Sequence, residues 1–509
     1  MKQWINRTFR WYYKRRYKQI QYTHHHGIAV QEAWLRYLTK KAASTQWGIP
    51  HKLSAVRDYA DFQQSMPIHE YDDLKPYIQR MMHGEKSVLW PGQVRWFAKS
   101  SGTTSDKSKF IPISSEHLKT CHIRGTWDTM TAVYHNRPDA RQFELKSMLM
   151  GGSVEHFSPF PETIFGDVSA IMIKHMPQVA RPFFIPDFET ALLADWEKKL
   201  ELLAQAGSRE PNVVMIGGVP TWTIVLFKRI LEISGKSNML EVWPNFQVYI
   251  HGGVSFKPYR PQFEAFFPSS GVDYLEIYNA SEGYFAVQDD LRTQDMLLLL
   301  DNGIFYEFLP MEEWGKANPE AITLADVELG RNYALVISTN GGLWRYVPGD
   351  TIQFTSVRPY KIKITGRIKQ FINAFGEEVM IDNTDQALAL TCETMPAKIM
   401  DYTVAPVYMD GTHKGGHQWL IEFKQKPDNL DAFSRLLDEN LQRINSDYEA
   451  KRFKNIALTN LNITPLPEGS FAHWLKSKGK LGGQNKVPRL SNDRKYVDEI
   501  LHFLQKSSF

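Results

Sequence analysis

Cysteine is scarce in this sequence: the chain of 509 residues contains only Cys121 and Cys392, far apart from each other. Two distant thiols exclude a disulfide framework and a thiolate metal cluster, so we expect a reducing, cytoplasmic setting. Long apolar runs are also missing. The longest one, residues 213–227, is interrupted by two glycines and a proline and is too short to cross a bilayer. The sequence therefore predicts no transmembrane helix.

Acidic residues are absent from the first 18 positions, although seven basic residues lie there. The remaining chain is slightly acidic, because it holds the other 53 of the 60 basic residues and all 56 acidic ones. Proteins that bind nucleic acid usually spread basic charge over their fold. This distribution therefore argues against nucleic acid as a partner.

The basic N-terminal segment has the pattern of an amphipathic helix, with apolar residues near helical spacing at Ile5, Phe9, Tyr13 and Tyr17. Two interpretations are open: a helix that lies on a membrane surface, or a first helix that packs on its own domain and keeps a solvated basic face. We favour the second, since charged faces are usual on surface helices. The three histidines at 24–26 lack carboxylate or thiolate partners, so we interpret them as a loop at a helix start rather than a metal site.

Short apolar runs that end in glycine predict the fold of the first part of the chain. Residues 213–216 and 246–250 each run into a Gly-Gly pair, and residues 274–278 run into a third glycine-containing turn. Each turn precedes a stretch that we interpret as helical. Strand, glycine turn and helix in alternation predict a largely parallel sheet, whose ligands bind at the carboxyl ends of its strands.

The pattern changes after residue 301. Asn340-Gly341 separates apolar runs at 333–339 and 343–347, which is a strong signal for an antiparallel hairpin. We therefore predict an α/β fold in two parts. Residues 1–366 form a large N-terminal domain of mostly parallel sheets plus an antiparallel β subdomain, and residues 367–509 form a small, mobile C-terminal α+β domain.

A run of small residues follows the apolar lead-in at 94–97 and has the chemistry of a loop that wraps phosphate. A glycine lets the backbone approach an anion, hydroxyls donate to phosphate oxygens, and Lys107 or Lys109 can supply positive charge. The Walker A spacing is missing, and an ordinary Ser/Thr-rich surface loop is the alternative. The candidate phosphate-binding residues are Ser100, Ser101, Gly102, Thr103 and Thr104.

Four further segments follow this loop in order, and together the five resemble the adenylate-forming ligase superfamily. Within it, the likeness is to the Gretchen Hagen three (auxin-responsive) family of acyl acid amido synthetases. It covers nearly the whole chain and includes segments 71–78 and 89–92 ahead of the loop. The four further segments are Tyr278-Asn279-Ala280-Ser281-Glu282-Gly283, Trp344-Arg345-Tyr346-Val347-Pro348-Gly349-Asp350, residues 366–377 and residues 484–489.

The resemblance implies that the loop holds the ATP phosphates and that the next segment binds ATP and Mg²⁺. Tyr278 would stack on adenine, Ser281 would touch the α-phosphate, and Glu282 would hold Mg²⁺, for which a carboxylate is a suitable hard ligand. The turn at Gly252 and Gly253 would pass beneath the purine. Taken alone, Glu282 is equally well explained as an acid at a helix N-terminus, where it complements the macrodipole.

For the later segments, the resemblance implies that Asp350 accepts both ribose hydroxyls and that Arg367 also reaches the ribose. Lys369 stands at the position of the interdomain hinge, where the superfamily often has aspartate. Lys486 would be the catalytic lysine that bridges the carboxylate and the α-phosphate. Without the resemblance, Asp350 reads as part of an ordinary Gly-Asp turn and Lys486 as a solvated lysine in a basic loop.

The resemblance thus implies an ATP-dependent ligase with ATP and Mg²⁺ as cofactors. It would adenylate a small carboxylic acid, release pyrophosphate, and transfer the acyl group to an amine, in this family an amino acid, to form an amide with release of AMP. Two alternatives stay open: an acyl-CoA ligase with a thiol acceptor, and a nucleotide-binding protein without turnover. The oligomeric state is left open, with a monomer favoured.

One residue is a candidate to anchor the carboxylate of the acyl substrate. Arg124 lies one helical turn after Thr120 and is close in sequence to the phosphate loop, and an arginine can bind a carboxylate through two hydrogen bonds. Aromatic residues such as Trp127 and Trp222 either line a flat pocket there or belong to the core.

Overall fold

The computed structural model describes residues 2–101, 108–254, 256, 259–268, 271–368, 371–409, 414–455, 457–478 and 487–506. Among these residues, no helix combines the length and the apolar character needed to cross a membrane.

Two long helices open the chain, α1 (Lys2–His25) and α2 (Gly27–Ala42). The inner face of α1 packs on its own domain, as we favoured: the ring centroid of Phe9 lies 3.9 Å from that of Phe143. The buried guanidinium of Arg16 donates to Asp128 at 2.7 Å and to Asp301 at 3.1 Å. The loop interpretation of residues 24–26 is wrong, because α1 continues through His25 and α2 follows after one residue. No cluster of metal-ligating side chains is found among the described residues.

An 11-stranded mixed sheet forms the centre of the molecule, in the order β12-β13-β14-β15-β11-β10-β9-β8-β7-β3-β6. From β9 to β6 neighbouring strands are parallel, and from β9 to β12 they are antiparallel. The predicted α/β fold is therefore confirmed, with both strand patterns in one continuous sheet. Its strands are β3 (Lys146–Met148), β6 (Phe184–Ile185), β7 (Val213–Gly217), β8 (Val248–His251), β9 (Asp273–Ala280), β10 (Gly283–Val287), β11 (Met296–Leu298), β12 (Ile304–Pro310), β13 (Asn332–Thr339), β14 (Asp350–Val357) and β15 (Tyr360–Arg367).

The prediction of a helix after residues 274–278 is wrong. β9 turns back at residues 281–282 into β10, with Ala280 opposite Gly283. All five residues of β10 are buried, so this segment completes the sheet instead of covering it. Glu282 therefore lies in a β-turn and not at a helix N-terminus.

The turn at residues 340–342 is confirmed, but residues 343–347 do not form a regular strand. Tyr346 exchanges two backbone hydrogen bonds of 2.8 Å with Ile337, as in a hairpin. Between them, Arg345 has a φ of +41°, which interrupts the ladder. The side chain of Arg345 is consequently directed to an ion pair with Glu307.

The free edge of β12 is covered by other parts of the chain. The Gln31 side chain on α2 donates to the carbonyl of Ile304 at 3.1 Å and accepts from the backbone N–H of Tyr306 at 2.8 Å. Further along, Phe308 and Ile322 exchange two backbone hydrogen bonds of 2.9 Å. Several outward-facing backbone groups of this edge strand are thus satisfied within the molecule.

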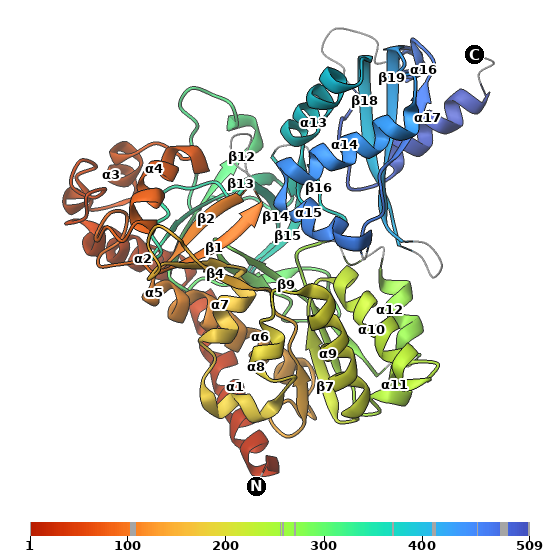
Figure 1. The fold of residues 1–509 in the computed structure, drawn as a ribbon. Coiled ribbons are helices and arrows are strands. Elements are labelled where there is room, and N and C mark those ends of the chain that lie inside the picture. The colour runs from red at the N-terminus through yellow and green to blue at the C-terminus, as the bar shows by residue number, and fades with distance from the viewer. Residues whose placement is uncertain are drawn as a thin grey trace.

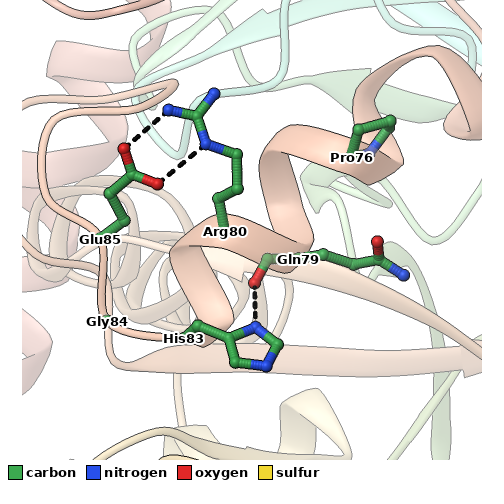
Figure 2. A pocket seen from close by; sticks show the side chains of 6 residues that line it. All are labelled: Pro76, Gln79, Arg80, His83, Gly84 and Glu85. Carbon is green, nitrogen blue, oxygen red and sulfur yellow. Dashed lines mark hydrogen bonds and ion pairs between the residues drawn. The ribbon is translucent and has the colours of Figure 1, made fainter.

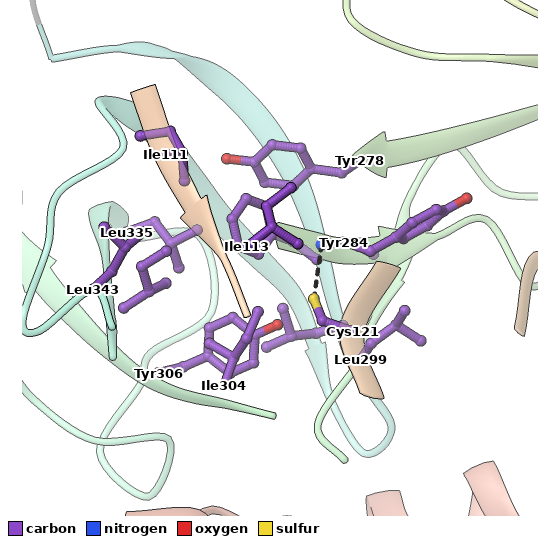
Figure 3. Packing of buried hydrophobic residues seen from close by; sticks show 14 of the residues in the cluster. Ile111, Ile113, Cys121, Tyr278, Tyr284, Leu299, Ile304, Tyr306, Leu335 and Leu343 are labelled. Carbon is purple, nitrogen blue, oxygen red and sulfur yellow. Dashed lines mark hydrogen bonds between the residues drawn. The ribbon is translucent and has the colours of Figure 1, made fainter. Parts of the chain in front are cut away.

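A second, four-stranded sheet lies against the central one, in the order β2-β1-β5-β4. Figure 3 shows how they meet: Ile111 and Ile113 of β2 point toward Tyr278 of β9, and Cys121 accepts the backbone N–H of Tyr284 at 3.2 Å. This packing fixes the position of the phosphate-loop stems relative to β9. The strands are β1 (Trp96–Ser101), β2 (Ser108–Ile113), β4 (Val154–His156) and β5 (Ile164–Gly166).

Helices surround both sheets in the large part of the molecule (Figure 1). α9 and α10 pack together beside the parallel strands, and α6 packs against both α1 and β10. The helix predicted after Gly217-Gly218 is confirmed as α10. The remaining helices here are α3 (Tyr59–Ser65), α4 (Tyr71–Met82), α5 (Ser115–His117), α6 (Arg124–Asn136), α7 (Val168–Lys174), α8 (Phe188–Ala191), α9 (Trp196–Arg209), α10 (Pro220–Ser234), α11 (Met239–Val242) and α12 (Arg260–Phe266).

After β15 the chain forms a smaller unit, seen in blue in Figure 1. Asn445 separates two consecutive helices of this unit: it ends the first, and its side chain caps the second by accepting from the N–H of Tyr448 at 2.8 Å. The elements are β16 (Phe371–Ile372), β17 (Val379–Met380), α13 (Ile381–Thr394), β18 (Lys398–Val407), β19 (Gly416–Gln425), α14 (Leu430–Ile444), α15 (Ser446–Arg452), β20 (Asn462–Leu466), α16 (Ser470–Ser477) and α17 (Lys495–Lys506). The domain boundary after residue 366 stays a prediction.

Candidate active site

Three predicted nucleotide-binding side chains meet at the carboxyl end of β9. The hydroxyl of Tyr278 donates to one carboxylate oxygen of Asp350 at 2.6 Å, and Nε of Arg367 donates to the other at 2.8 Å. Strand pairing explains this contact, since Asp350 begins β14 directly opposite Arg367 at the end of β15. Tyr278 and Asp350 are both buried, at 5% and 8% exposure. Residues separated by 72 positions thus form one polar group.

Glu282 lies in the adjacent turn between β9 and β10 and is buried. The hydroxyl of Tyr346 donates to its carboxylate at 3.4 Å. Burial raises the pKa of Glu282 above its ordinary value, and the positive charge of Lys109 partly offsets this rise. The backbone of the turn is held too, because Nε2 of His117 lies 3.1 Å from the carbonyl oxygen of Glu282. Its carboxylate is a hard oxygen ligand of the kind that Mg²⁺ prefers.

The stems of the phosphate loop reach the same place. Ser100 and Ser101 end β1 and pair with Lys109 and Ser108 at the start of β2. Ser281 on the neighbouring turn approaches the carbonyl of Lys99 at 3.5 Å. The other predicted residues of the loop, Gly102, Thr103 and Thr104, lie outside the described residues, as does Lys107.

The sequence left open whether Lys107 or Lys109 supplies positive charge to the site. The position of Lys109 in β2 places its charge close enough to influence Glu282, and its ammonium also lies 5.9 Å from the ring centroid of Tyr71. The two-residue period of a strand was the available signal, because it places Lys109 on the same face as Ile111.

The glycine turn after β8 packs closely against β9. A Cβ atom at Gly252 would lie only 2.5 Å from the carbonyl oxygen of Ile277, so a side chain would not fit there. Gly253 has a φ of +82°, which favours glycine. Its carbonyl oxygen accepts from the Asn373 side chain at 2.9 Å. The turn therefore connects the central sheet to the segment after the predicted hinge.

The sequence did not reveal the hydrogen bonds that two polar residues of this segment make, Asn373 and Glu378. Glu378 accepts from Nη2 of Arg367 at 2.5 Å, so Arg367 bridges two carboxylates. Its guanidinium also stacks over Phe371 at 4.9 Å. Such contacts between distant segments leave no local pattern by which they could be found. The predicted hinge residue Lys369 and the predicted catalytic Lys486 lie outside the described residues.

Within the described residues, no hydrogen bond or ion pair joins Arg124 to Tyr278, Asp350 or Glu282. Its guanidinium donates to Asp301 at 2.5 Å on the side of the molecule where α1 lies. There it lines a hollow of about 470 Å³ together with Arg15, Lys18 and Tyr22. The nearby Trp127 packs among aromatic core residues, with its ring centroid 5.9 Å from that of Phe9. The role of Arg124 in acyl-acid binding stays a prediction.

Another hollow, of about 460 Å³, lies at the end of α4 (Figure 2). Arg80 and Glu85 form an ion pair across it at 2.7 Å, and both side chains are about 40% exposed. None of the predicted site residues lines it. A solvent-exposed ion pair of this kind contributes little to stability or binding.

Comparison with known proteins agrees with the order of these segments along the chain. Residues 16–218 and 162–272 match the GH3 family N-terminal domain, residues 297–367 the GH3 family central domain, and residues 382–495 the GH3 family C-terminal domain. Indole-3-acetic acid-amido synthetase GH3.3 of Arabidopsis thaliana is 23% identical, over 90% of this chain and 89% of its own length. Jasmonoyl-L-amino acid synthetase JAR6 of Nicotiana attenuata is also 23% identical, over 90% of both chains.

Two solved structures share the fold. The GH3.15 acyl acid amido synthetase has a TM-score of 0.58 and 18% identity, and the match covers 93% of each chain. A 2-hydroxyisobutyryl-CoA ligase in complex with 2-HIB-AMP and CoA has a TM-score of 0.59 and 13% identity, with 95% of this chain and 93% of the ligase covered.

Proposed function

Because the chain belongs to the GH3 family, we propose that it is an ATP-dependent acyl acid amido synthetase. It adenylates a small carboxylic acid and transfers the acyl group to the amine of an amino acid. The observation that carries this proposal is the meeting of Tyr278, Asp350, Arg367 and Glu282 at the end of β9. β9 is the last strand of the parallel part of the sheet, and ligands of α/β sheets bind outside the carboxyl ends of such strands. Both cysteines are free thiols, and we place the reaction in the cytoplasm.

We assign the ribose of ATP to Asp350, whose carboxylate can accept both hydroxyls, with Arg367 fixing its orientation. Tyr278 provides the aromatic face for adenine, above the turn at Gly252 and Gly253. We assign the ATP phosphates to the hydroxyls of Ser100, Ser101 and Ser281. On the family likeness, Gly102, Thr103 and Thr104 also bind the phosphates.

Glu282 fits Mg²⁺, because its carboxylate is a hard oxygen ligand held in a buried position. When bound there, the ion would neutralise charge on the phosphates. Lys109 adds a positive charge on the same side. We assign Lys486 as the catalytic lysine on the family likeness. Lys109 and Lys486 would then together stabilise the negative charge that develops at the α-phosphate.

In the first step, an oxygen of the substrate carboxylate attacks the α-phosphorus in line, a new O–P bond forms, and the bond to pyrophosphate breaks. In the second, the amine attacks the acyl carbon, loses a proton, and AMP leaves with the bonding electron pair. Activation is required because a free carboxylate resists amine attack. Held in line, the reactants avoid the entropy cost of a bimolecular encounter.

Between the steps, we propose that the unit after residue 366 turns about Lys369 to exchange Lys486 for the amine. The contacts that such a turn must break are both apolar and polar, because Tyr259 and Phe263 of the large part share one buried cluster with Phe375. Asn373 bonds to Gly253 at 2.9 Å, Ser108 bonds to Ser446 at 3.1 Å, and Lys454 pairs with Glu197. Exposed ion pairs are weak, whereas the buried hydrogen bond from the Tyr259 hydroxyl to the carbonyl of Ala374 adds to the free energy that the turn costs.

The proposal is tested by the exchange of labelled pyrophosphate into ATP with a panel of carboxylic acids. At least one acid should support exchange, and adding amino acids should then give an amide, identified by mass spectrometry. Coenzyme A is the comparison acceptor: a thioester in place of an amide would support an acyl-CoA ligase. Folded protein that binds ATP but exchanges no pyrophosphate with any acid would indicate a nucleotide-binding protein without turnover.

Asp350→Asn is expected to raise the KM for ATP about 10- to 100-fold, since a hydrogen bond to a charged group contributes about 1.5–3 kcal/mol. The amide keeps the shape of the side chain but removes the charge that Arg367 and the ribose share. The measurement is the ATP dependence of pyrophosphate exchange. Asp290→Asn is the matched control, because Asp290 pairs with the exposed Arg292 in its own turn and is not among the residues assigned to ATP. An unchanged KM in Asp350→Asn would remove Asp350 from the ribose site.

The acid limb of the pH profile is expected to lie above the range in which an ordinary glutamate titrates. Burial raises the pKa of Glu282, so its carboxylate takes up a proton at a higher pH and then no longer binds a cation. Protons and metal compete for the carboxylate, so raising the Mg²⁺ concentration should move this limb to lower pH. Pyrophosphate exchange measured between pH 4.5 and 8 at two Mg²⁺ concentrations tests this. If the acid limb stayed at the same pH at both Mg²⁺ concentrations, the assignment of Glu282 as the Mg²⁺ ligand would be contradicted.

A further inference from the structure

The outer face of α1 carries large aromatic side chains that contact little of the protein. Trp4 is 71% exposed, Trp11 is 60% exposed and Tyr22 is 66% exposed. At 100° per residue, these three positions fall within 20° of one another around the helix, so they form a single stripe along it. The opposite stripe contains the buried Tyr13 and Ile20. α1 therefore has two apolar faces, and only one of them is covered.

Positive charge surrounds this stripe. α1 contains no acidic residue, and the first acid in the chain is Glu32. Arg15 lies on the stripe itself, with its guanidinium 5.4 Å from the ring centroid of Trp11. The other exposed basic residues of α1 are Arg7, Lys14 and Lys18.

The hollow beside the second half of α1 extends the basic surface. Its lining includes Arg15, Lys18 and Arg124, and Asp301 is the one acid in that lining. Asp301 is already bonded to Arg16 and Arg124, so it adds little free negative charge. A hollow with this excess of cations beside exposed aromatic rings suits an anionic headgroup at an apolar boundary.

We propose that this face of α1, together with the hollow, binds the surface of a membrane that contains anionic phospholipids. Tryptophan and tyrosine favour the boundary between headgroups and acyl chains, and arginine and lysine beside them bind lipid phosphates. A second copy of the chain would bring the same basic charges face to face. Nucleic acid fits less well, because the rest of the chain has more acidic than basic residues.

The position of α1 is compatible with attachment. Figure 1 shows the N-terminal end of α1 at the lower tip of the molecule and the unit after β15 at the opposite end. Binding through α1 would leave that unit unobstructed. The proposal is independent of the nucleotide site, since none of the residues assigned to nucleotide lies on α1 or lines the hollow.

The test is flotation of the full-length chain with vesicles of phosphatidylcholine alone or with about 30% phosphatidylglycerol. The protein should float only with the anionic vesicles, and 0.5 M salt should release it. Trp4→Ser combined with Trp11→Ser should weaken binding about tenfold or more. Arg15→Gln combined with Lys18→Gln should weaken it by about 30-fold. The matched control is Lys40→Gln with Lys41→Gln, which removes two exposed charges from α2 and should leave binding unchanged.

Brominated acyl chains provide a second measurement, because they quench only tryptophans that enter the bilayer. Quenching should be lost in the Trp4→Ser/Trp11→Ser variant, while circular dichroism and thermal unfolding stay as in the parent chain. No flotation with anionic vesicles would overturn the proposal. So would flotation that persists in both double variants, or a concentration-dependent dimer that the Trp substitutions dissociate in the absence of any vesicle binding.

Discussion

Glu282→Gln is expected to lower the rate of acyl-adenylate formation by about 100- to 1,000-fold, the loss seen when one preorganised electrostatic group is removed from an active site. Glutamine keeps the size of the side chain and its contact with the hydroxyl of Tyr346, but it cannot supply a negative charge to Mg²⁺. Lys109 would also lose the carboxylate that it faces. Pyrophosphate exchange at saturating acid measures the effect.

The fold should not suffer, because burial already disfavours the charged form of Glu282 and a neutral amide is easier to bury. Thermal unfolding of the variant should therefore match or exceed that of the parent chain. Glu264→Gln is the control: Glu264 lies on α12 with a 56% exposed side chain and pairs with the exposed Arg260. If Glu282→Gln exchanged pyrophosphate at the parental rate, Glu282 could not be the metal ligand.

Arg345→Met is expected to lower the free energy of unfolding by about 3–5 kcal/mol, the usual cost of leaving a buried charge without its partner. The Arg345 side chain is 4% exposed and that of Glu307 is 0% exposed, and their closest N–O distance is 2.8 Å. Arg345 also donates to the backbone carbonyl of Met66 at 2.9 Å. The substitution thus removes a buried ion pair and a buried hydrogen bond.

Urea unfolding followed by tryptophan fluorescence measures this loss. Arg292→Met is the matched control, because the Arg292 side chain is 89% exposed and its ion pair should contribute at most about 1 kcal/mol. Combining Arg345→Met with Glu307→Gln removes the orphaned charge as well, so the double variant should recover part of the lost stability. A double variant less stable than Arg345→Met alone would show that the ion pair is not the source of the effect.

The sequence predicted well whatever local patterns encode. The strands at 213–216 and 333–339, helix α10 and the turn at 340–342 all had strong signals of periodicity or turn chemistry, and all are present. Tyr278 and Asp350 were proposed as nucleotide-binding residues from separate motifs, and the structure brings them within hydrogen-bonding distance. Nothing in their sequence separation required that contact.

The wrong predictions concern segments whose local pattern fits more than one structure. Residues 283–287 were expected to begin a helix, but they pair with β9 because the sheet continues there in the antiparallel direction. Arg345 belonged to a motif associated with the nucleotide, yet its side chain serves a buried ion pair. The contacts of Asn373 and Glu378 were missed, because their partners Gly253 and Arg367 lie 120 and 11 positions away in the sequence.

The covered edge of β12 also affects how the protein behaves at high concentration. An exposed edge strand is the usual starting point for intermolecular β-sheet growth and for amyloid. Here Gln31 and the bridge between Phe308 and Ile322 already occupy the groups that an incoming strand would need. A neighbouring molecule would first have to displace α2, so aggregation through this edge requires partial unfolding.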